Sequence, residues 1–375
     1  MGAGIGGIAA GIALLDAGFQ VTVFEKSEEL REAGAGMSLW PNGTGVLQEL
    51  GLLDRVMQHG ALGTNFLLRN TSGELLMNIR TAEADTPTVC VHRADLLRAL
   101  TDAFPHECLK LDHAVEELSF TGAKARLKFS NGEEFVCDGV IGADGIHSRI
   151  RSSLPGARKP AYQGYAIVRA VADAPSGLPS GHNEETWGAG NRFGVLAIGR
   201  NKVCWYATAN TSGPRQLARD CKDRWLETFS GWHGFIPDLI AQTDPAAILV
   251  SDACDLVPFR SHSPQPVTLL GDASHALTPN LGQGACLALE DSFVLAGCLR
   301  QYSNITEAFR RYESLRFSHL LSAVLRSRWL GYVGQWESRA AVALRNAITR
   351  ILPASNFECH IPFAEYMARL TRVTA

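Results

Sequence analysis

Hydrophobic positions along the chain follow two periods, one typical of helices and one typical of strands. Residues 4–18 carry small and apolar side chains at helical spacing, and the run at 21–24 reads as a short buried strand. PVTLL at 266–270 predicts another buried strand. Further helical patterns cover residues 46–58, 93–103, 284–330 and 335–351. Helices that alternate with buried strands indicate an α/β fold.

The middle of the chain has a different pattern. Between residues 163 and 211, strand-like runs are separated by clusters of Gly, Pro, Ser and Asn, which predicts a mostly antiparallel sheet. Residues 124–141 read as a hairpin with Asn131 and Gly132 at its turn. The sequence therefore predicts an antiparallel sheet inserted into an α/β frame.

Composition and charge narrow the functional classes. The 375 residues are 46% hydrophobic and 19% charged, which suits one or two globular domains. The formal net charge of -3 gives no basic field for nucleic acid, and no apolar stretch has the roughly 18 residues of a membrane span. The nine cysteines form neither a CxxC pair nor a disulfide framework, so we expect a cytoplasmic protein without a bound metal.

A glycine-rich turn stands at the start of the chain. Residues 2–7 read GAGIGG, which fits G-x-G-x-x-G through Gly2, Gly4 and Gly7. In a dinucleotide-binding turn these glycines permit the tight turn, the approach of a pyrophosphate and close helix packing, respectively. Glu25 follows the strand-like run, where a carboxylate accepts hydrogen bonds from a ribose. A simple tight turn and a solvated charge are the alternative interpretations.

The strand that should precede this motif is absent, because Met1 stands immediately before Gly2. Two explanations are open. A chain start assigned too far downstream would leave the strand in the natural protein, whereas a real truncation would remove a central strand of the sheet. We expect the first.

Two further segments extend the motif pattern. GADGIHSRIR at 142–151 and LLGDASHALTPNLGQGACLALEDS at 269–292 resemble the DG and GD fingerprints of the single-component flavin-dependent aromatic hydroxylases. These are the group A monooxygenases, built on the para-hydroxybenzoate hydroxylase fold. The three motifs stand in the family's order and spacing. The chain most resembles the branch of salicylate, 3-hydroxybenzoate and urate hydroxylases.

The resemblance implies a domain organisation. A Rossmann-like FAD-binding domain of the glutathione reductase type, with its first strand missing, would comprise residues 1–160 and 255–300. A mostly antiparallel substrate domain would comprise 161–254 with parts of 60–92. The C-terminal helices would occupy 301–375.

The resemblance also assigns residues to the cofactor. Asp272 would accept hydrogen bonds from the ribityl hydroxyls of FAD, Pro279 would face the flavin, and the helix that begins after Gly282 and Gly284 would stabilise negative charge on the reduced ring. His275 is expected to make a structural or flavin-adjacent hydrogen bond rather than to act as a catalytic base. The residues expected to bind the cofactor are Gly2, Gly4, Gly7, Glu25, Arg93, Asp144, Gly145, Arg151, Gly271, Asp272 and Gln283.

The implied reaction uses NADH or NADPH, which would visit transiently to reduce the bound FAD. O₂ would add at the flavin C4a as a hydroperoxide, and one oxygen atom would pass to an aromatic or heteroaromatic small molecule. The candidates for substrate contact are Trp187, Phe193, Trp205 and Tyr206, although aromatic residues on strands usually pack in a core.

Several points are left open by the sequence. No residue is identified as a general base, and the protein is expected to be a monomer or a homodimer. An epoxidase and a tailoring oxygenase of the tetracycline-inactivating kind are alternatives with the same fold. A flavin-binding protein or reductase without oxygenase activity is the alternative from another class.

Overall fold

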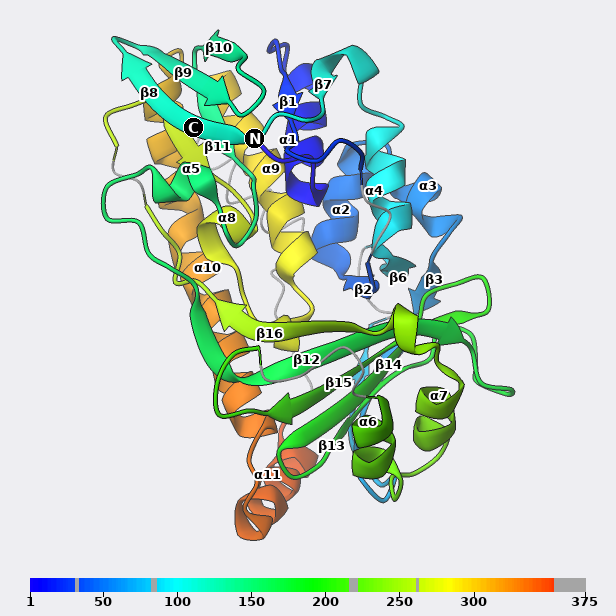
Figure 1. Cartoon of the computed structure of the whole chain (residues 1–375). Coiled ribbons are helices and arrows are strands. Elements are labelled where there is room, and N and C mark those ends of the chain that lie inside the picture. The colour runs from blue at the N-terminus through cyan, green and yellow to red at the C-terminus, as the bar shows by residue number, and fades with distance from the viewer. Residues whose placement is uncertain (31–33, 82–85, 216–221, 261–262, 354–375) are drawn as a thin grey trace.

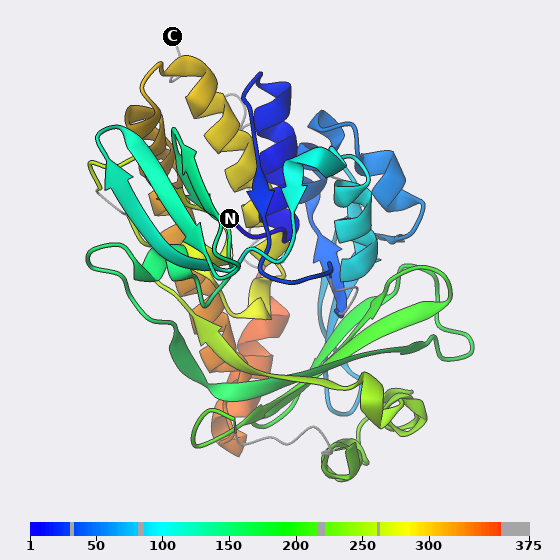
Figure 2. The same cartoon turned by 45° about the horizontal axis from the view of Figure 1, so that its top comes forward.

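The structure of the protein is a computed structural model, and it describes residues 1–30, 34–81, 86–215, 222–260 and 263–353 (Figure 1). Two units make up this part of the chain. One holds the N-terminal helix and several small sheets, and the other is built on one large sheet. The long helix α10 (Ile305–Gly334) runs alongside both units (Figures 1 and 2).

The first unit surrounds α1 and α9, which pack against each other. Gly6 permits this contact, because a Cβ atom there would lie 2.8 Å from Leu270 Cδ1 and 3.1 Å from Ala288 Cβ. Its helices and 3-10 turns are α1 (Ile5–Asp16), α2 (Pro41–Glu49), α3 (Leu53–Met57), α4 (Arg93–Thr101), η1 (His106–Cys108), α5 (Arg149–Ser152), α8 (Asp272–His275), η3 (Pro279–Leu281) and α9 (Gly284–Gln301).

The strands of the first unit form four small sheets, of which two are parallel pairs, one is β2–β6–β3 and one is the antiparallel β8–β9–β10. The two parallel pairs are β1–β7 and β11–β17. These strands are β1 (Val23–Phe24), β2 (Gly36–Leu39), β3 (Ala61–Gly63), β6 (Thr88–His92), β7 (Leu109–Lys110), β8 (Val115–Thr121), β9 (Lys124–Phe129), β10 (Glu134–Cys137), β11 (Val140–Gly142) and β17 (Val267–Leu269).

Met1 and Gly2 link the two parallel pairs. The Met1 amine donates a hydrogen bond to Ile141 O at 2.8 Å, and Met1 O accepts one from Ala143 N at 2.7 Å. On the other side, Gly2 N donates to Phe24 O at 2.7 Å. These bonds occupy the position between β1 and β11 in which the first strand was expected.

The second unit is a seven-stranded sheet with the order β16-β12-β15-β14-β13-β4-β5, antiparallel except for the parallel pair β13–β4. Its strands are β4 (Asn65–Asn70), β5 (Leu75–Arg80), β12 (Ala161–Asp173), β13 (Asn183–Trp187), β14 (Asn191–Ala197), β15 (Lys202–Asn210) and β16 (Leu249–Asp255). The sheet therefore draws strands from both segments in which the substrate domain is expected.

The outer face of this sheet is covered by α6 (Lys222–Phe229) and α7 (Ile236–Gln242), followed by the turn η2 (Pro245–Ala247). Both helices lie on the side turned away from the first unit (Figures 1 and 2). The inner face is turned toward the first unit and α10, so the site must be built between them.

Two predicted helices are interrupted. The pattern at 46–58 is divided between α2 and α3 because Gly51 adopts a φ of +69°, a left-handed conformation that ends the first helix. The pattern at 284–330 is divided between α9 and α10, where the Asn304 side chain accepts a hydrogen bond from Glu307 N and caps α10. A last helix, α11, spans Arg339–Ile351. None of the helices that the structure describes is long and apolar enough to cross a membrane.

A buried ion network holds α9 against α10 and α8. Arg316 donates from Nε to Asp291 at 2.7 Å and from Nη1 to Glu290 at 2.6 Å. Asp291 also accepts hydrogen bonds from His275 Nε2 at 2.5 Å and from Gly271 N at 2.9 Å. The network thereby fixes Gly271 and the start of α8.

We predict that Arg316→Met strongly destabilises the protein. Breaking a buried ion pair by removing one partner costs about 3–5 kcal/mol, because the remaining charges stay buried without a counter-charge. Arg310→Met is the matched control on the exposed side of α10, where about 0.5 kcal/mol or less is expected. Denaturant unfolding followed by circular dichroism measures both, and equal stability of the two variants would contradict the role given to Arg316.

The same network predicts a loss of stability in acid. Burial alone would raise the pKa of Asp291 and Glu290, but the charges of His275, Arg316 and His319 outweigh it and lower both pKa values to about 2. A lowered carboxyl pKa contributes stability above its unfolded value, and that stability is lost as the pH falls toward the folded value. The thermal midpoint should therefore fall between about pH 4.5 and pH 2.

Glu290→Gln tests the assignment, because it removes one of the two titrating groups. The thermal midpoint of this variant should be lower than that of the wild type at pH 6, and below pH 6 it should depend less on pH. Asp138→Asn, at an exposed position, should follow the wild-type curve. An unchanged pH slope in Glu290→Gln would show that other carboxyls cause the acid transition.

Candidate functional site

The glycine-rich turn and Glu25 are joined directly. Glu25 Oε2 accepts a hydrogen bond from Ala3 N at 2.9 Å, and Oε1 accepts one from Ser27 N at 3.1 Å. A Cβ atom at Gly7 would lie 1.9 Å from Gly2 O, whereas a Cβ at Gly4 would have no neighbour within 4 Å. Gly7 is therefore required for packing inside the protein, and Gly4 leaves free space in front of the turn.

Asp272 stands at the start of α8 with two cationic neighbours. Its side chain is exposed to solvent, yet surrounding protein atoms desolvate it enough to raise its pKa, while the charges of His275 and Arg93 act in the opposite direction. No hydrogen-bond donor to its carboxylate is found in the part of the chain that the structure describes. An accessible carboxylate with protein close around it suits hydrogen bonds from the hydroxyl groups of a ligand.

Arg93 begins α4 beside residues 34–36. Its backbone N donates to Ala35 O at 3.0 Å, and a Cβ atom at Gly34 would lie 2.9 Å from Arg93 Cβ. Gly34 thus lets this loop pass close to Arg93, on the same side as Asp272.

The segment around Asp144 is tightly folded on itself. Asp144 accepts hydrogen bonds from Ser148 Oγ, Arg149 N and Ile150 N, so it caps the short helix α5. Gly145 has a φ of +79°, which permits the turn between them. Arg151 is buried and donates to backbone carbonyls, including Ala273 O at 2.8 Å. Arg151 therefore joins this segment to α8.

The loop that leads into α9 carries the residues expected to face the flavin. Pro279 and Gly282 are exposed, and Gly282 has a left-handed φ of +62°. Gln283 is buried, and its Oε1 accepts a hydrogen bond from Asn42 Nδ2 at 2.9 Å. Gly284 is the first residue of α9. Exposed backbone beside a helix N-terminus offers N–H groups to a ligand that carries negative charge.

The inner face of the large sheet carries a row of polar residues. Arg169, Tyr206, Gly194 and Glu185 are directly paired across β12, β15, β14 and β13, so they project to one face. A Cβ atom at Gly194 would lie 2.1 Å from Tyr206 Cζ, which means that the tyrosine ring lies over this glycine. The Tyr206 hydroxyl donates a hydrogen bond to Glu185, and burial followed by the charge of Glu185 raises the pKa of Tyr206 well above its ordinary value.

Arg192 connects this row to the loop before α9. It donates to Glu185 Oε1 at 3.1 Å, to Asn280 Oδ1 at 2.6 Å and to Gln335 Oε1 at 2.9 Å. Gly334 makes room for it, because a Cβ atom there would lie 3.0 Å from Arg192 Cδ. Asn280 follows Pro279, so the contact fixes the candidate flavin loop against the sheet.

The four aromatic candidates for substrate contact lie on different faces. Tyr206 and Trp187 project to the inner face. The Arg345 guanidinium lies over the Trp187 ring, with its Cζ 5.1 Å from the ring centroid. Phe193 and Trp205 lie on the outer face, within the hydrophobic cluster beneath α6 and α7. Their rings are stacked, with 5.4 Å between the ring centroids. Strand alternation sends them away from the site, so their predicted contact with substrate is replaced by an outer-core role.

Sequence reasoning missed the polar partners of this face. Glu185 and Arg192 stand in no motif, and Asn280 received no role although it lies within the segment 269–292; for the strand residues, a signal was present in the strand pattern. In β14 the alternation places Phe193 on one face and Arg192 on the other. A charged residue on the face opposite an aromatic core was the available sign of an inner polar surface.

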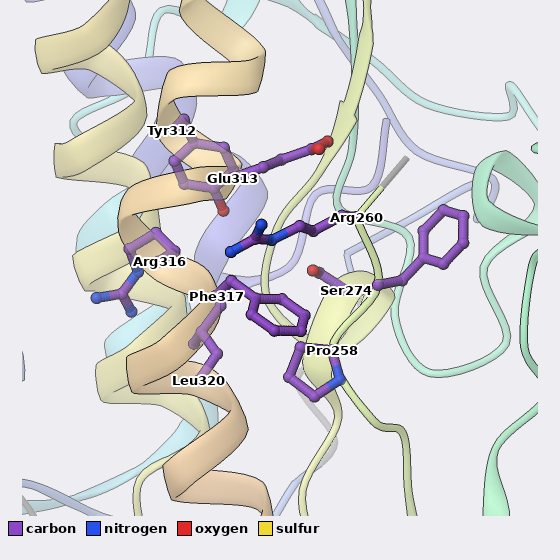
Figure 3. Close-up of a pocket in the computed structure, with 9 residues that line it drawn as sticks. Pro258, Arg260, Ser274, Tyr312, Glu313, Arg316, Phe317 and Leu320 are labelled. Atoms are coloured by element: carbon purple, nitrogen blue, oxygen red, sulfur yellow. The ribbon is translucent and has the colours of Figure 1, made fainter. Parts of the chain in front are cut away.

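A separate small crevice lies beside α10, with about 230 Å³ of empty space including its open mouth. In Figure 3 the Arg260 guanidinium lies against the Phe317 ring, and the distance from its Cζ to the ring centroid is 4.0 Å. This volume is below the range of about 300–1,000 Å³ for small-molecule sites. The crevice therefore does not replace the site formed by the glycine turn, Asp272 and the inner sheet face.

The residues present fit a flavin dinucleotide. Gly4 leaves open space at the turn, Glu25 is oriented by backbone amides, and Asp272 lacks a donor in the described chain. Residues 1–30, 34–81, 86–215, 222–260 and 263–353 contain no group of three or more His, Cys, Asp or Glu residues arranged to hold a metal ion.

Comparison with known proteins agrees with this geometry. Residues 1–306 match the model of the family described as FAD binding domain. The chain is 34% identical to aurachin C monooxygenase/isomerase of Stigmatella aurantiaca, over 95% of this chain and 94% of that protein. It is 30% identical to an FAD-dependent urate hydroxylase of Klebsiella pneumoniae, over 88% of each. The crystal structure of Klebsiella pneumoniae HpxO with FAD and uric acid matches with a TM-score of 0.87 and 27% identity, covering 95% of this chain and 92% of that one.

We predict that Gly4→Ala and Gly7→Ala fail in different ways. Gly7→Ala should destabilise the protein by about 1–3 kcal/mol or more, because its Cβ meets the backbone. Gly4→Ala should change the stability of the FAD-free protein by less than about 1 kcal/mol and weaken FAD binding by about tenfold or more, because the methyl group fills the space in front of the turn.

Gly297→Ala, in the middle of α9 with open space at its Cβ, is the control and should leave FAD binding unchanged. Thermal unfolding of the FAD-free proteins and fluorescence titration with FAD give the two quantities. Wild-type FAD affinity in Gly4→Ala would rule out this turn as the approach of the cofactor.

Proposed function

The chain belongs to the FAD-binding family of flavin-dependent aromatic monooxygenases, and we infer that it inserts one oxygen atom from O₂ into an aromatic or heteroaromatic small molecule, with NADH or NADPH as reductant. The main support for this reaction is the hydrogen bond between Arg192 and Asn280, because it joins the candidate flavin loop to the polar face of the large sheet. A reductase alone would not require a second surface held against that loop.

The proposed cofactor residues have separate roles. Gly2, Gly4 and Gly7 would admit the pyrophosphate of FAD, Glu25 would bind its ribose, and Asp272 would bind its ribityl chain. Arg93, Asp144, Gly145 and Arg151 would complete this side of the site, together with Gly271 and Gln283. The loop from Pro279 to Gly284 would face the ring. Bound FAD supplies the electrons and the activated oxygen, which no side chain can provide.

The sheet face would hold the substrate. Arg192 fixes Asn280 and Glu185 in place, and the Tyr206 hydroxyl donates a hydrogen bond to Glu185. Because the pKa of Tyr206 is raised, the phenol stays neutral and offers its oxygen as an acceptor. A ring placed over Tyr206 would lie between the sheet and the flavin loop, where surrounding side chains exclude water.

An alternative reaction is favoured by one comparison. The likeness to aurachin C monooxygenase/isomerase extends over 95% of this chain, and the name of that protein combines oxygenation with isomerisation. We therefore retain a tailoring oxygenase or epoxidase that acts on a polycyclic aromatic as the second candidate. Analysis of the product separates the two, since a hydroxylase leaves the carbon skeleton unchanged.

The cellular setting is also a proposal. The seven cysteines that the structure describes are free, which suits a reducing compartment, and NAD(P)H is available in the cytoplasm. We place the enzyme there, as a monomer or homodimer. We also propose a division into FAD-binding residues 1–160 and 255–300, a substrate domain at 161–254 with parts of 60–92, and C-terminal helices at 301–375. The place of β4 and β5 in the large sheet supports the assignment of 60–92.

We predict substrate-stimulated consumption of NAD(P)H with transfer of one labelled oxygen atom from O₂ to the product. Arg192→Met should lower kcat/KM by about tenfold or more and divert reducing equivalents to hydrogen peroxide, because the loop and sheet lose their contact. Lys202→Met, at an exposed position, is the control. If no aromatic compound in a broad panel stimulates NAD(P)H consumption, the oxygenase proposal is wrong.

A further inference from the structure

The C-terminal helix α11 has its apolar residues on the outside. Within α11, all of which the structure describes, the buried side chains are those of Arg345 and Thr349, whereas Leu344, Ile348 and Ile351 are exposed. A helix that packs on a protein core normally buries its apolar side and exposes its polar side. The orientation of α11 is the reverse, so its apolar side faces away from the protein.

Specific hydrogen bonds fix α11 in this orientation. The Arg345 guanidinium donates to Gly334 O at 3.1 Å and to Gly188 O at 3.0 Å, and it also lies over the Trp187 ring. Figure 1 shows α11 at the lower end of the molecule, beside the last turns of α10. The helix cannot rotate to bury Leu344 without breaking these bonds, and a buried guanidinium without acceptors is costly. The exposure of the apolar side is therefore set by the packing of the helix.

The last turns of α10 add exposed aromatic side chains. Trp329 is 61% exposed and Tyr332 is 70% exposed. The Tyr332 ring lies edge-on to the Trp336 ring, with 6.2 Å between the centroids. Six of the eleven large apolar residues that are exposed in the described chain lie on α10 and α11. Trp and Tyr combine an apolar ring with a polar group, and both are enriched where protein meets the boundary between lipid and water.

The charge of this end of the chain differs from that of the whole. Residues 314–353 contain six arginines and one glutamate, a net charge of +5, although the whole chain carries -3. Helix α11 holds Arg339, Arg345 and Arg350 and no acidic residue. Arg339 is exposed, and Arg350 forms a surface ion pair with Glu74 at 2.7 Å. An exposed apolar row with arginines at both ends is typical of helices that lie on a membrane surface with anionic lipids.

A second copy of the chain is a poorer match for this face of α11. In a symmetric dimer the same face meets itself, so the arginines of the two helices would approach and repel one another. Anionic lipid headgroups supply the opposite charge. The acyl boundary beneath them accepts apolar side chains to a depth of about 5–10 Å. Charge and apolar surface therefore favour the same occupant.

We propose that α11 is a membrane-surface helix, which binds the protein to a bilayer that contains anionic lipids and does not cross it. Leu344, Ile348 and Ile351 enter the boundary between the headgroups and the acyl chains, and Arg339 contacts the lipid phosphates. This inference goes beyond the proposed oxygenase function and does not depend on it.

Co-sedimentation of the full-length holoenzyme with vesicles tests the proposal. One set of vesicles contains equal parts of phosphatidylcholine and phosphatidylglycerol, and the other contains phosphatidylcholine alone. The wild type should partition onto the anionic vesicles about tenfold or more strongly than onto the neutral ones, because arginines near the surface add electrostatic attraction. Added salt should weaken this preference, since it screens exposed charges.

A double variant assigns the binding to α11. Leu344→Gln with Ile348→Gln removes two apolar side chains and keeps the charge and the helix propensity. Its partitioning onto anionic vesicles should fall by about tenfold or more. The control is Leu62→Gln with Val136→Gln, at exposed positions of β3 and β10, and it should stay within about twofold of the wild type. Thermal midpoints and FAD content verify that every variant is folded and loaded.

Two results would overturn the proposal. One is a wild type that does not bind anionic vesicles, and the other is an α11 variant that binds them as strongly as the wild type. Sedimentation velocity without lipid identifies a different occupant, because a wild-type dimer that dissociates in the α11 variant would assign this face to a second copy. Turnover is not measured in these experiments, so the oxygenase proposal stands or fails separately.

Discussion

The contact of Arg192 with Asn280 is the interaction on which the proposed chemistry depends. Oxygen transfer requires a substrate and a flavin to be held within about 0.5 Å of the reactive geometry, yet the proposed sites for the two lie on different units of the chain. Arg192 belongs to the sheet and Asn280 to the loop before α9, and their 2.6 Å hydrogen bond joins the two units beside the candidate flavin loop. Glu185 and Gln335 orient the guanidinium, so the contact has little freedom.

A second arginine stabilises the other side of the same loop. Arg316 is bound to Glu290 and Asp291, and Asp291 in turn holds Gly271 and His275. The turn that carries Asp272 is thus fixed by buried charges, while the loop that carries Pro279 is fixed by Arg192. A cofactor placed between these supports would meet a preorganised surface.

Features built from residues close together in the sequence could be predicted, and features built from distant residues could not. The glycine turn with Glu25 and the segment around Asp272 stand in short continuous motifs, so the fold class, the family and FAD could be predicted from the sequence and are confirmed. The sequence did not show which face of the sheet each aromatic residue occupies. Phe193 and Trp205 fill the outer core because strand alternation, and not residue type, decides the face. The individual cofactor contacts stay predictions.

The sequence by itself determined the local chemistry: which backbone turns accept a dinucleotide, where a helix begins, and which strands are buried. These properties depend on residues a few positions apart, and the φ angles and hydrogen bonds of one segment suffice to express them. Only the tertiary structure decided which residues share the reaction surface. Glu185, Arg192, Asn280 and Gln335 are brought together by strand register and by the passage of α10 across the sheet. Such contacts form because packing joins distant segments, and no local pattern encodes them.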